Sequence, residues 1–448
     1  MQGGESPSSA GVSLSSSPVD LIATSVSSAL YDAATSLEAQ QGNGARAPLA
    51  EAPTSVTTDG DPGSLADISN QTSAAPACTN DSEACAVADA PNYEAFEDTG
   101  ASLDLKIWEL KIAQDFINEL HTASLDDSKL SQAAIKRLRN TPRTATPETM
   151  DPLLRLSIEI YLATENASQK MYNEIRDAFH RCYPNDKLLS YDEVKNCLAE
   201  LTGIYPLLED MCPNSCIAFT GPFKKLDKCP LCGAARYDEH KLAASGGKEK
   251  VGRSFYTIPI GPQVQALLRS PQTAEHMHYR KELIAQITET MKNAHPPGFM
   301  EAYEDIFHGS DFLAVHEWGD IGPDDILLML SIDGAQLYQN KQSDCWIYIW
   351  VVLNLSPDLR YKKKYVLPGS FIPGPNKPKN LDSFLFPGLH HVAALQKEGL
   401  SLWDAYDNRT FLAALYVALA TANSPGMASI NGLVGHHGGH GCRVGCPM

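Results

Sequence analysis

The sequence predicts a mixed fold, of the α+β or α/β class, in which a tail and a helical region precede a cysteine-rich module and a C-terminal sheet. Three observations support this prediction. Residues 1–100 show no sustained apolar period, whereas residues 103–209 repeat apolar side chains at helical spacing. Residues 326–359 contain two dense apolar runs of the kind that form strands buried on both faces.

The negative charge of the chain is concentrated at its start. The formal net charge is −18 over 448 residues, and residues 1–100 hold fourteen acids and one base, Arg46, which gives −13. The other 348 residues therefore carry only −5. The acidity does not exclude a nucleic-acid partner for the folded part, although it removes any simple argument from basicity.

Residues 1–100 are rich in Ser, Ala, Thr, Pro and Gly, so we predict a disordered acidic tail with at most a short helix around residues 19–39. No targeting signal is evident, because the start lacks a basic region followed by an apolar core. The longest apolar stretches, 345–355 and 411–422, are shorter than the ~20 residues that cross a bilayer. We therefore expect no membrane partner.

Residues 101–209 form the predicted helical region, with three or four helices. Ser124, Thr146 or Asp151 are candidate N-caps, and Ser190 with Glu193 three residues later forms a capping box. Such helices either pack only against the protein or also bind DNA or another partner, and both interpretations stay open here.

Two closely spaced cysteine pairs follow in residues 210–240. Their four members, separated by a short linking segment, are Cys212, Cys216, Cys229 and Cys232. Four thiolates at this spacing can close tetrahedrally on Zn²⁺, which predicts a zinc ribbon with a structural rather than catalytic metal. A redox CxxC motif is the alternative, but it lacks a strand-to-helix setting and leaves the first pair unexplained.

A linker and helices are predicted for residues 241–323, and the core of interest occupies residues 324–448. Strands are expected at 326–332, 345–355, 362–371 and 411–422, with a helix at 381–400 before the last of them. The order strand, strand, strand, helix, strand is that of the opening half of a ribonuclease H-like fold, in which carboxylates from the first and fourth strands meet.

Asp333 is the candidate carboxylate of the first strand. It follows the run from Ile326 to Ile332 and precedes Gly334, so we expect it at the end of a central strand, where many nucleases hold a metal ion. An ordinary Asp-Gly strand terminus is the alternative interpretation.

Several blocks in this order resemble the transposases of CACTA (En/Spm-type) DNA transposons. They read CPNSCIAFTGPFKKLDKCPLCGAARYDE, LSIDGAQLY, LPGSFIPGPNKPKNLDSFLFPGLHHVAALQKEGLSLWDAYDN and FLAALYVALATANSPGMASINGLVGHHGGHGCRVGC, within residues 103–448. The resemblance implies a DDE enzyme that acts on transposon-end DNA in the nucleus through two Mg²⁺ or Mn²⁺ ions, and it leaves an oligomer open. It also implies that Asp333 is the first family acid.

The position of the second family acid is occupied by Asn423, directly after the fourth predicted strand. An amide cannot supply the negative charge that holds two cations together, and the third acid, a glutamate, has no counterpart before Met448. Asp404 and Asp407 are weaker substitutes for the second acid. We therefore expect a truncated, catalytically impaired copy, or alternatively a non-catalytic zinc-containing module that binds DNA or protein.

The last twenty residues contain five further nitrogen and sulfur donors, His436, His437, His440, Cys442 and Cys446. They could hold a second metal ion, because the family places a cysteine pair after its second acid. A loose, glycine-rich terminus is the alternative interpretation of the same residues.

Overall fold

The computed structural model describes residues 107–143, 150–238, 243–244, 251–295, 298, 300, 302–336 and 344–431, all of which fall in one compact unit. The predicted disordered tail and its helix at 19–39 lie outside these residues, as do the five donors of the C-terminal segment. Thr146, one of the candidate caps, is also outside them. No helix in the described part of the chain is long and apolar enough to cross a membrane.

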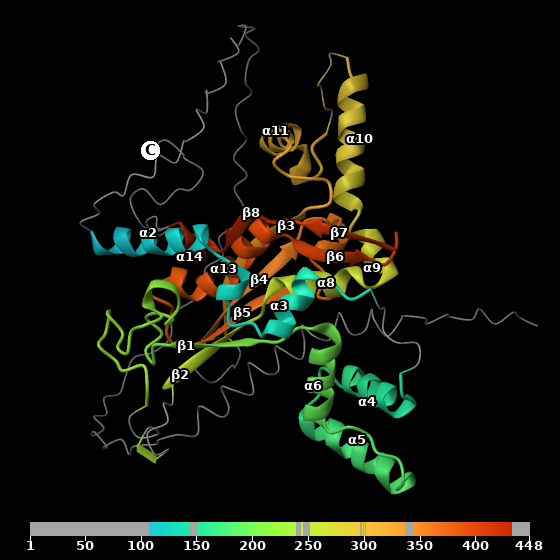
Figure 1. Cartoon of the computed structure of the whole chain (residues 1–448), viewed down its shortest axis with the longest axis vertical. Helices are drawn as coiled ribbons and strands as arrows, with labels where there is room; N and C mark the ends of the chain where they lie inside the picture. Colours follow the sequence, from blue (N-terminus) through green and yellow to red (C-terminus); the bar gives the residue numbers. More distant parts are fainter. Residues whose placement is uncertain are drawn as a thin grey trace, which may run out of the picture. The chain divides into compact units, whose positions relative to one another are not determined.

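Six strands form the main sheet, in the order β1-β2-β5-β4-β3-β8 (Figure 1). The strands are β1 (Leu207–Met211), β2 (Arg253–Thr257), β3 (Ile326–Gln336), β4 (Asp344–Val352), β5 (Val366–Pro373) and β8 (Leu415–Ala422). All neighbouring pairs are antiparallel except β3 and β8, which run parallel. A separate hairpin joins β6 (Leu400–Asp404) to β7 (Arg409–Ala413).

Most helices before β3 lie either ahead of β1 or after β2, and η2 lies between these two strands. They are α2 (Trp108–His121), η1 (Leu125–Asp127), α3 (Gln132–Arg139), α4 (Pro152–Ala163), α5 (Gln169–Cys182), α6 (Tyr191–Thr202), η2 (Gly221–Phe223), α8 (Ile260–Leu268), α9 (Pro271–His276), α10 (Tyr279–Asn293), η3 (Ile306–His308) and α11 (Ser310–Trp318). Those after β3 are α12 (Pro357–Arg360), α13 (Leu381–Glu398) and α14 (Ser424–Ile430).

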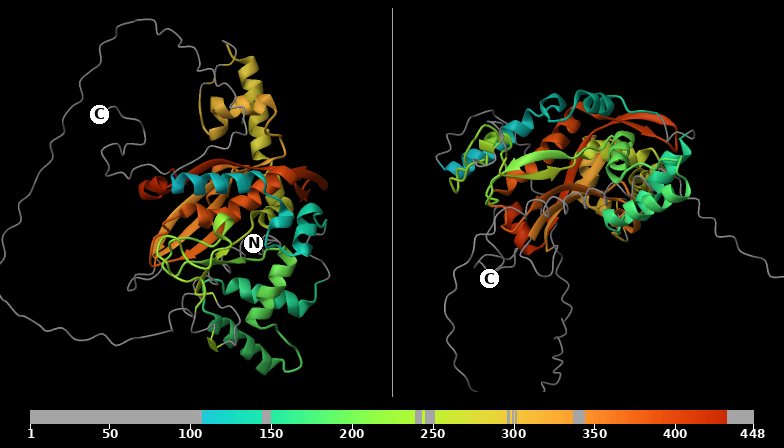
Figure 2. Two further views of the ribbon diagram at one scale, coloured as in Figure 1. Left: turned by 60° about the vertical axis from the view of Figure 1, so that its left-hand side comes forward. Right: turned by 90° about the horizontal axis from the view of Figure 1, so that it is seen from below.

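Strand β3 is buried on both faces along its first half, as its apolar run predicts. Leu328 and Leu330 belong to the largest core cluster, together with side chains of α8 and α13. Leu327 and Met329 point the other way and pack with side chains of α10 and η3. In the left view of Figure 2, α10 (yellow) stands above the sheet, whose central strands are drawn in orange and red. Strand β3 is therefore apolar on both faces because helices cover both of them.

Helix α13 lies so close to the sheet that one of its positions has no room for a side chain. A methyl group added at Gly388 would overlap the hydroxyl of Tyr348, a fully buried residue of β4. Close contact between α13 and β4 therefore depends on this glycine.

We expect Gly388→Ala to destabilise the protein by about 1–3 kcal/mol through overpacking, although alanine normally favours a helix by about 1 kcal/mol over glycine. Urea unfolding of the full chain measures the change. The double variant Gly388→Ala/Tyr348→Phe removes the overlapping oxygen and should recover most of the loss. A more stable Gly388→Ala single variant would contradict this packing.

The expected fourth strand at 411–422 was wrong in its extent. Residues 409–413 form β7, which folds back on β6, and only residues 415–422 form β8 beside β3. The hairpin turns at Asn408, whose φ is 49°, and the amide of Ala414 then donates to the Asp325 carboxylate at 2.8 Å. One apolar run therefore serves two strands, and the segment just before it, Leu400–Asp404, forms β6.

The predicted helical region divides into two packing groups. Helices α4, α5 and α6 share a small core that includes Tyr161, Tyr172 and Leu198, whereas α2 and α3 pack against α13 and the main core. The capping box is confirmed, because the side chains of Ser190 and Glu193 each accept a hydrogen bond from the backbone amide of the other at the start of α6. Asp151 caps α4.

Candidate functional site

Asp333 lies inside β3, two-thirds of the way along the strand, rather than at its end as predicted. The strand continues to Gln336 because Asp333, Gly334 and Ala335 still pair with β4. The Asp333 carboxylate is exposed, and its Oδ1 accepts a hydrogen bond from the Gly334 amide at 2.8 Å. It shares a strand face with Leu327 and Met329 but lies beyond the cluster that covers them.

Asn423 comes next to Asp333 through the parallel pairing of β3 and β8. Ile332 pairs with Ala422, so the next residues along the two parallel strands, Asp333 and Asn423, lie side by side. The Asn423 Nδ2 donates to the Asp333 Oδ1 at 2.6 Å. The structure thus brings together two positions that are 90 residues apart in the sequence.

Asn423 also caps a helix, and this contact fixes the orientation of its side-chain amide. Asn423 is the N-cap of α14, and its Oδ1 accepts a hydrogen bond from the Gly426 amide at 2.8 Å. A cap must offer an oxygen to the helix, so the amide orientation assigned from these partners directs the nitrogen toward Asp333. The pair therefore presents one carboxylate and one N–H donor, where a two-metal site needs oxygen ligands from both residues.

Asp404 and Asp407 lie elsewhere in the fold. Asp404 contacts His278, and Arg409 of the same hairpin binds Asp324, which lies two residues before the start of β3. Asp333 is seven positions after Ile326 in β3, a span of about 23 Å. These two acids therefore belong to the opposite end of β3 and do not accompany Asp333.

The four cysteines of the predicted ribbon converge on one point. Their Sγ atoms all lie within 4.8 Å of one another, and Cys212 Sγ is 3.5 Å from Cys232 Sγ. Zn–S bonds of about 2.3 Å in a tetrahedral site would place the sulfur atoms about 3.8 Å apart. The cluster, which comprises Cys212, Cys216, Cys229 and Cys232, could therefore hold zinc with little movement.

Each cysteine pair is shaped by one residue with positive φ. Ser215 (φ 58°) closes the first turn and Gly233 (φ 74°) the second. Backbone amides then bond across each turn, from Cys212 to Ile217 and from Cys229 to Ala234, both at 2.9 Å. These turns aim both thiols of a pair in one direction.

The pKa values of Cys216, Cys229 and Cys232 differ because burial and hydrogen bonding act differently on these three thiols. Burial, together with the neighbouring sulfur atoms, raises the pKa of Cys216 to about 12 and that of Cys229 to about 11. For Cys232, slight burial raises the pKa, but hydrogen bonds from the Ala234 amide, Asn214 and the other cysteines outweigh it and lower the pKa to about 6. A bound cation would stabilise all four thiolates at once, because each sulfur atom would then lie next to positive charge.

The cysteine cluster is firmly joined to the rest of the unit. The chain enters it directly from β1, which extends the main sheet through β2. Phe116 of α2 and Phe386 of α13 pack in the same apolar cluster as Cys216. The Ala218 amide also donates to the Ser383 Oγ at 2.9 Å. The module is therefore part of the sheet's edge rather than a separate appendage.

Comparison with known proteins assigns a class to the C-terminal part. Residues 300–447, which are 148 of the 448 residues, match the family model described as Transposase family tnp2. This segment contains β3, β4, β5 and β8, and with them Asp333 and Asn423. The protein is therefore transposase-like over this part. A comparison with curated proteins returned no match.

One group of residues was missed by the sequence analysis. His278, together with Asp404 and Asp407, forms a second cluster of side chains that can bind a metal. His278 and Asp404 are 126 residues apart, and no local spacing connects them. Only the tertiary packing of α10 against the β6–β7 hairpin reveals the group.

Proposed function

We propose that this chain is a CACTA (En/Spm-type) transposase-like protein that binds transposon-end DNA in the nucleus but has an impaired catalytic site. The observation that carries the proposal is the 2.6 Å contact between Asn423 and Asp333 across the parallel strands β8 and β3. It is supported by the transposase family match over the same strands.

The sheet also supports a ribonuclease H-like core. Strands β5, β4, β3 and β8 are neighbours in that order, β3 to β5 are antiparallel and sequential, and β8 returns parallel to β3 after α13. This is the arrangement expected for the first half of such a core. In such a core the acids of the first and fourth strands meet, and here Asp333 of β3 lies beside Asn423, the residue that follows β8.

The residues at this edge do not fit the two divalent ions of a DDE enzyme. Asp333 offers a carboxylate suited to Mg²⁺ or Mn²⁺, but Asn423 directs an N–H group at it. A partial positive charge therefore occupies the side of Asp333 on which a cation would bind. We derive no catalytic step through metal at this site.

The four-cysteine cluster fits zinc, and its thiolates would hold the ion as a structural crosslink between β1 and the segment beyond it. The chain combines a complete set of four cysteines with an amide, Asn423, at the position of the second acid. This combination favours the second candidate function, a non-catalytic zinc-containing module that binds DNA or protein. Neither candidate predicts Mg²⁺-dependent cleavage. They differ in the partner, which is transposon-end DNA for the first candidate and either DNA or another protein for the second.

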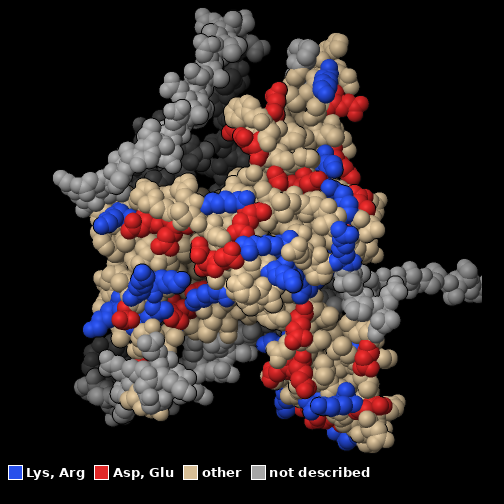
Figure 3. All heavy atoms as spheres, viewed as in Figure 1, with Lys and Arg blue, Asp and Glu red and all other residues tan. Residues whose placement is uncertain are grey.

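The segment between the cysteine pairs offers a surface for DNA. Lys224, Lys225 and Lys228 are exposed there. Figure 3 shows basic side chains gathered over this part of the molecule, whereas basic and acidic side chains alternate over much of the remaining face. Lysines placed together in this way attract phosphate and release counterions on binding.

Full-length protein should shift a transposon-end duplex, and replacing Lys224, Lys225 and Lys228 with glutamine should weaken this binding about tenfold or more at moderate salt. The slope of log affinity against log salt should become shallower by about 0.9 for each phosphate that the variant no longer neutralises. Changing Lys362, Lys363 and Lys364 to glutamine removes equal charge elsewhere and is the matched control.

The proposal further predicts no Mg²⁺-dependent cleavage of the bound duplex. Mg²⁺-dependent nicking that disappears in Asp333→Ala would contradict the impaired site. Failure of the full-length chain to shift any duplex at low salt would instead remove the DNA partner and leave a protein partner.

A further inference from the structure

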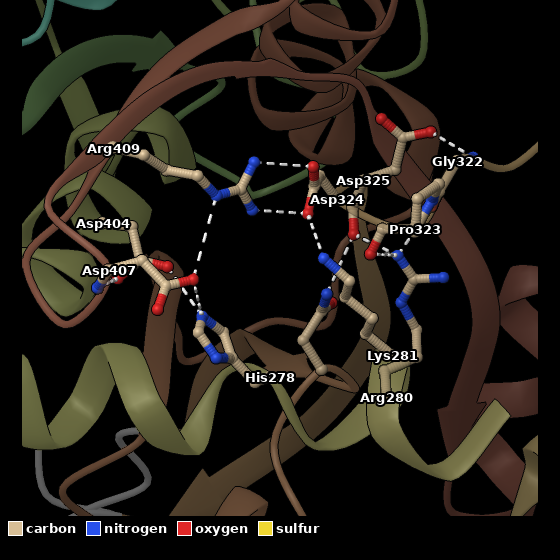
Figure 4. Close-up of polar contacts among 11 residues, drawn as sticks. His278, Arg280, Lys281, Gly322, Pro323, Asp324, Asp325, Asp404, Asp407 and Arg409 are labelled. Atoms are coloured by element: carbon tan, nitrogen blue, oxygen red, sulfur yellow. Dashed lines mark hydrogen bonds and ion pairs between the residues drawn. The ribbon is translucent and has the colours of Figure 1, made fainter. Parts of the chain in front are cut away.

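A group of three metal-binding side chains lies beside the β6–β7 hairpin (Figure 4). His278 immediately precedes α10, Asp404 ends β6, and Asp407 lies in the turn between β6 and β7. The His278 Nε2 is 2.7 Å from the Asp404 Oδ2 and 3.9 Å from the Asp407 Oδ2. All three ligand atoms lie within 4.8 Å of one another.

The Asp404 carboxylate is held in place by the backbone of its own turn. Its Oδ1 accepts hydrogen bonds from the amides of Tyr406 and Asp407, at 2.9 and 3.1 Å. The Asp404 side chain is only 1% exposed, and its other oxygen is thereby directed at His278. Backbone bonds of this kind orient a metal ligand before the ion arrives.

The nearest basic side chains are already bound to another acid. Arg409 makes two hydrogen bonds with Asp324, at 2.6 and 2.9 Å, and Lys281 lies 3.6 Å from the same carboxylate. The Arg409 Nε stays 4.0 Å from Asp407. Two carboxylates, one of them buried, thus converge on an imidazole while these neighbouring cations mainly neutralise Asp324. Such an arrangement favours an added cation.

We propose that His278, Asp404 and Asp407 bind a divalent transition-metal ion of the Mn²⁺ or Zn²⁺ class. One imidazole nitrogen and two carboxylate oxygens suit these borderline ions, and the 46% exposed side chain of Asp407 leaves room for water ligands. Metal–ligand bonds of about 2.0–2.2 Å place neighbouring ligands about 3 Å apart, so the observed 2.7 and 3.9 Å need small adjustments.

The bound ion would fasten the start of α10 to the hairpin that leads into β8. It would act at the end of β3 opposite Asp333, so the inference does not depend on the proposed transposase function. Binding uses the Nε2 lone pair, and His278 therefore binds the ion as neutral imidazole.

Mn²⁺ is the probe that separates this site from the cysteine cluster, because thiolates favour softer ions. Electron paramagnetic resonance of free Mn²⁺ measures binding to full-length protein that carries one zinc ion per chain, which the four thiolates take in preference to His278 and its two carboxylates. We expect one saturable Mn²⁺ per chain, and at least tenfold weaker binding in Asp407→Asn. Asp333→Asn should bind as the unchanged protein does.

His278→Gln is a second test, in case one variant alters folding, and melting curves without metal identify such a loss. The proposal is overturned if millimolar Mn²⁺ shows no saturable binding, if folded Asp407→Asn and His278→Gln bind Mn²⁺ unchanged, or if Asp333→Asn abolishes the binding instead.

Discussion

Replacing Cys232 with serine should remove zinc from the protein and lower its free energy of unfolding by several kcal/mol. Structural zinc sites of this type contribute about 10–16 kcal/mol of binding free energy in small zinc domains, and here the site lies within an apolar cluster that includes Phe116 and Phe386. Losing one of four thiolates should let a chelator strip zinc under conditions that leave the unchanged protein loaded.

The chain supplies a matched control for this experiment. Cys182, at the end of α5, is exposed just as Cys232 is, and it does not belong to the cysteine cluster. Neither substitution opens a cavity in the core, so a difference between Cys232→Ser and Cys182→Ser reports the metal alone. Metal analysis gives the zinc content, and urea unfolding gives the stability. Equal zinc content and stability in the two variants would exclude the four-thiolate site.

Replacing Asn423 with aspartate should strengthen Mn²⁺ binding at Asp333 by at least tenfold, which is about 1.4 kcal/mol. One carboxylate oxygen could keep the bond to the Gly426 amide, while the other would face Asp333 in place of the present N–H group. Without metal the two carboxylates would repel each other, so the variant should be less stable at neutral pH and regain stability with Mn²⁺.

This measurement is best made in an Asp407→Asn background, so that Mn²⁺ bound beside His278 does not obscure the change. Asn423→Ser is the control, because serine also caps a helix but brings no charge. If Asn423→Asp binds Mn²⁺ no more tightly than Asn423→Ser, then Asp333 and position 423 do not form a metal-binding pair and the proposed second-acid position is wrong.

Much of the main sheet was predictable because its central strands carry strong local signals. The run from Ile326 to Ile332 is apolar on both faces, and the structure covers both faces with helices. The hairpin of β6 and β7 was not predictable in the same way. Residues 411–422 are uniformly apolar, and periodicity alone cannot tell where one strand ends and its neighbour begins.

The candidate sites also differ in how far local sequence signals could place their residues. The two cysteine pairs were predicted from spacing, because a short turn brings both members of a pair together whatever the rest of the fold does. The position of Asp333 within β3 was wrong by three residues, since strand pairing with β4 carries β3 on to Gln336. The strength of a local signal thus decided which residues could be placed.

The sequence by itself determined the order of the elements from β3 to α13, the spacing of the four cysteines and the amide at position 423. Tertiary structure decided that Asn423 directs its nitrogen at Asp333, that β1 and β2 extend the sheet, and that His278 meets Asp404. The physical reason is the range of the interactions. Turn geometry and helical period act over a few residues, whereas sheet register and packing join residues about a hundred positions apart.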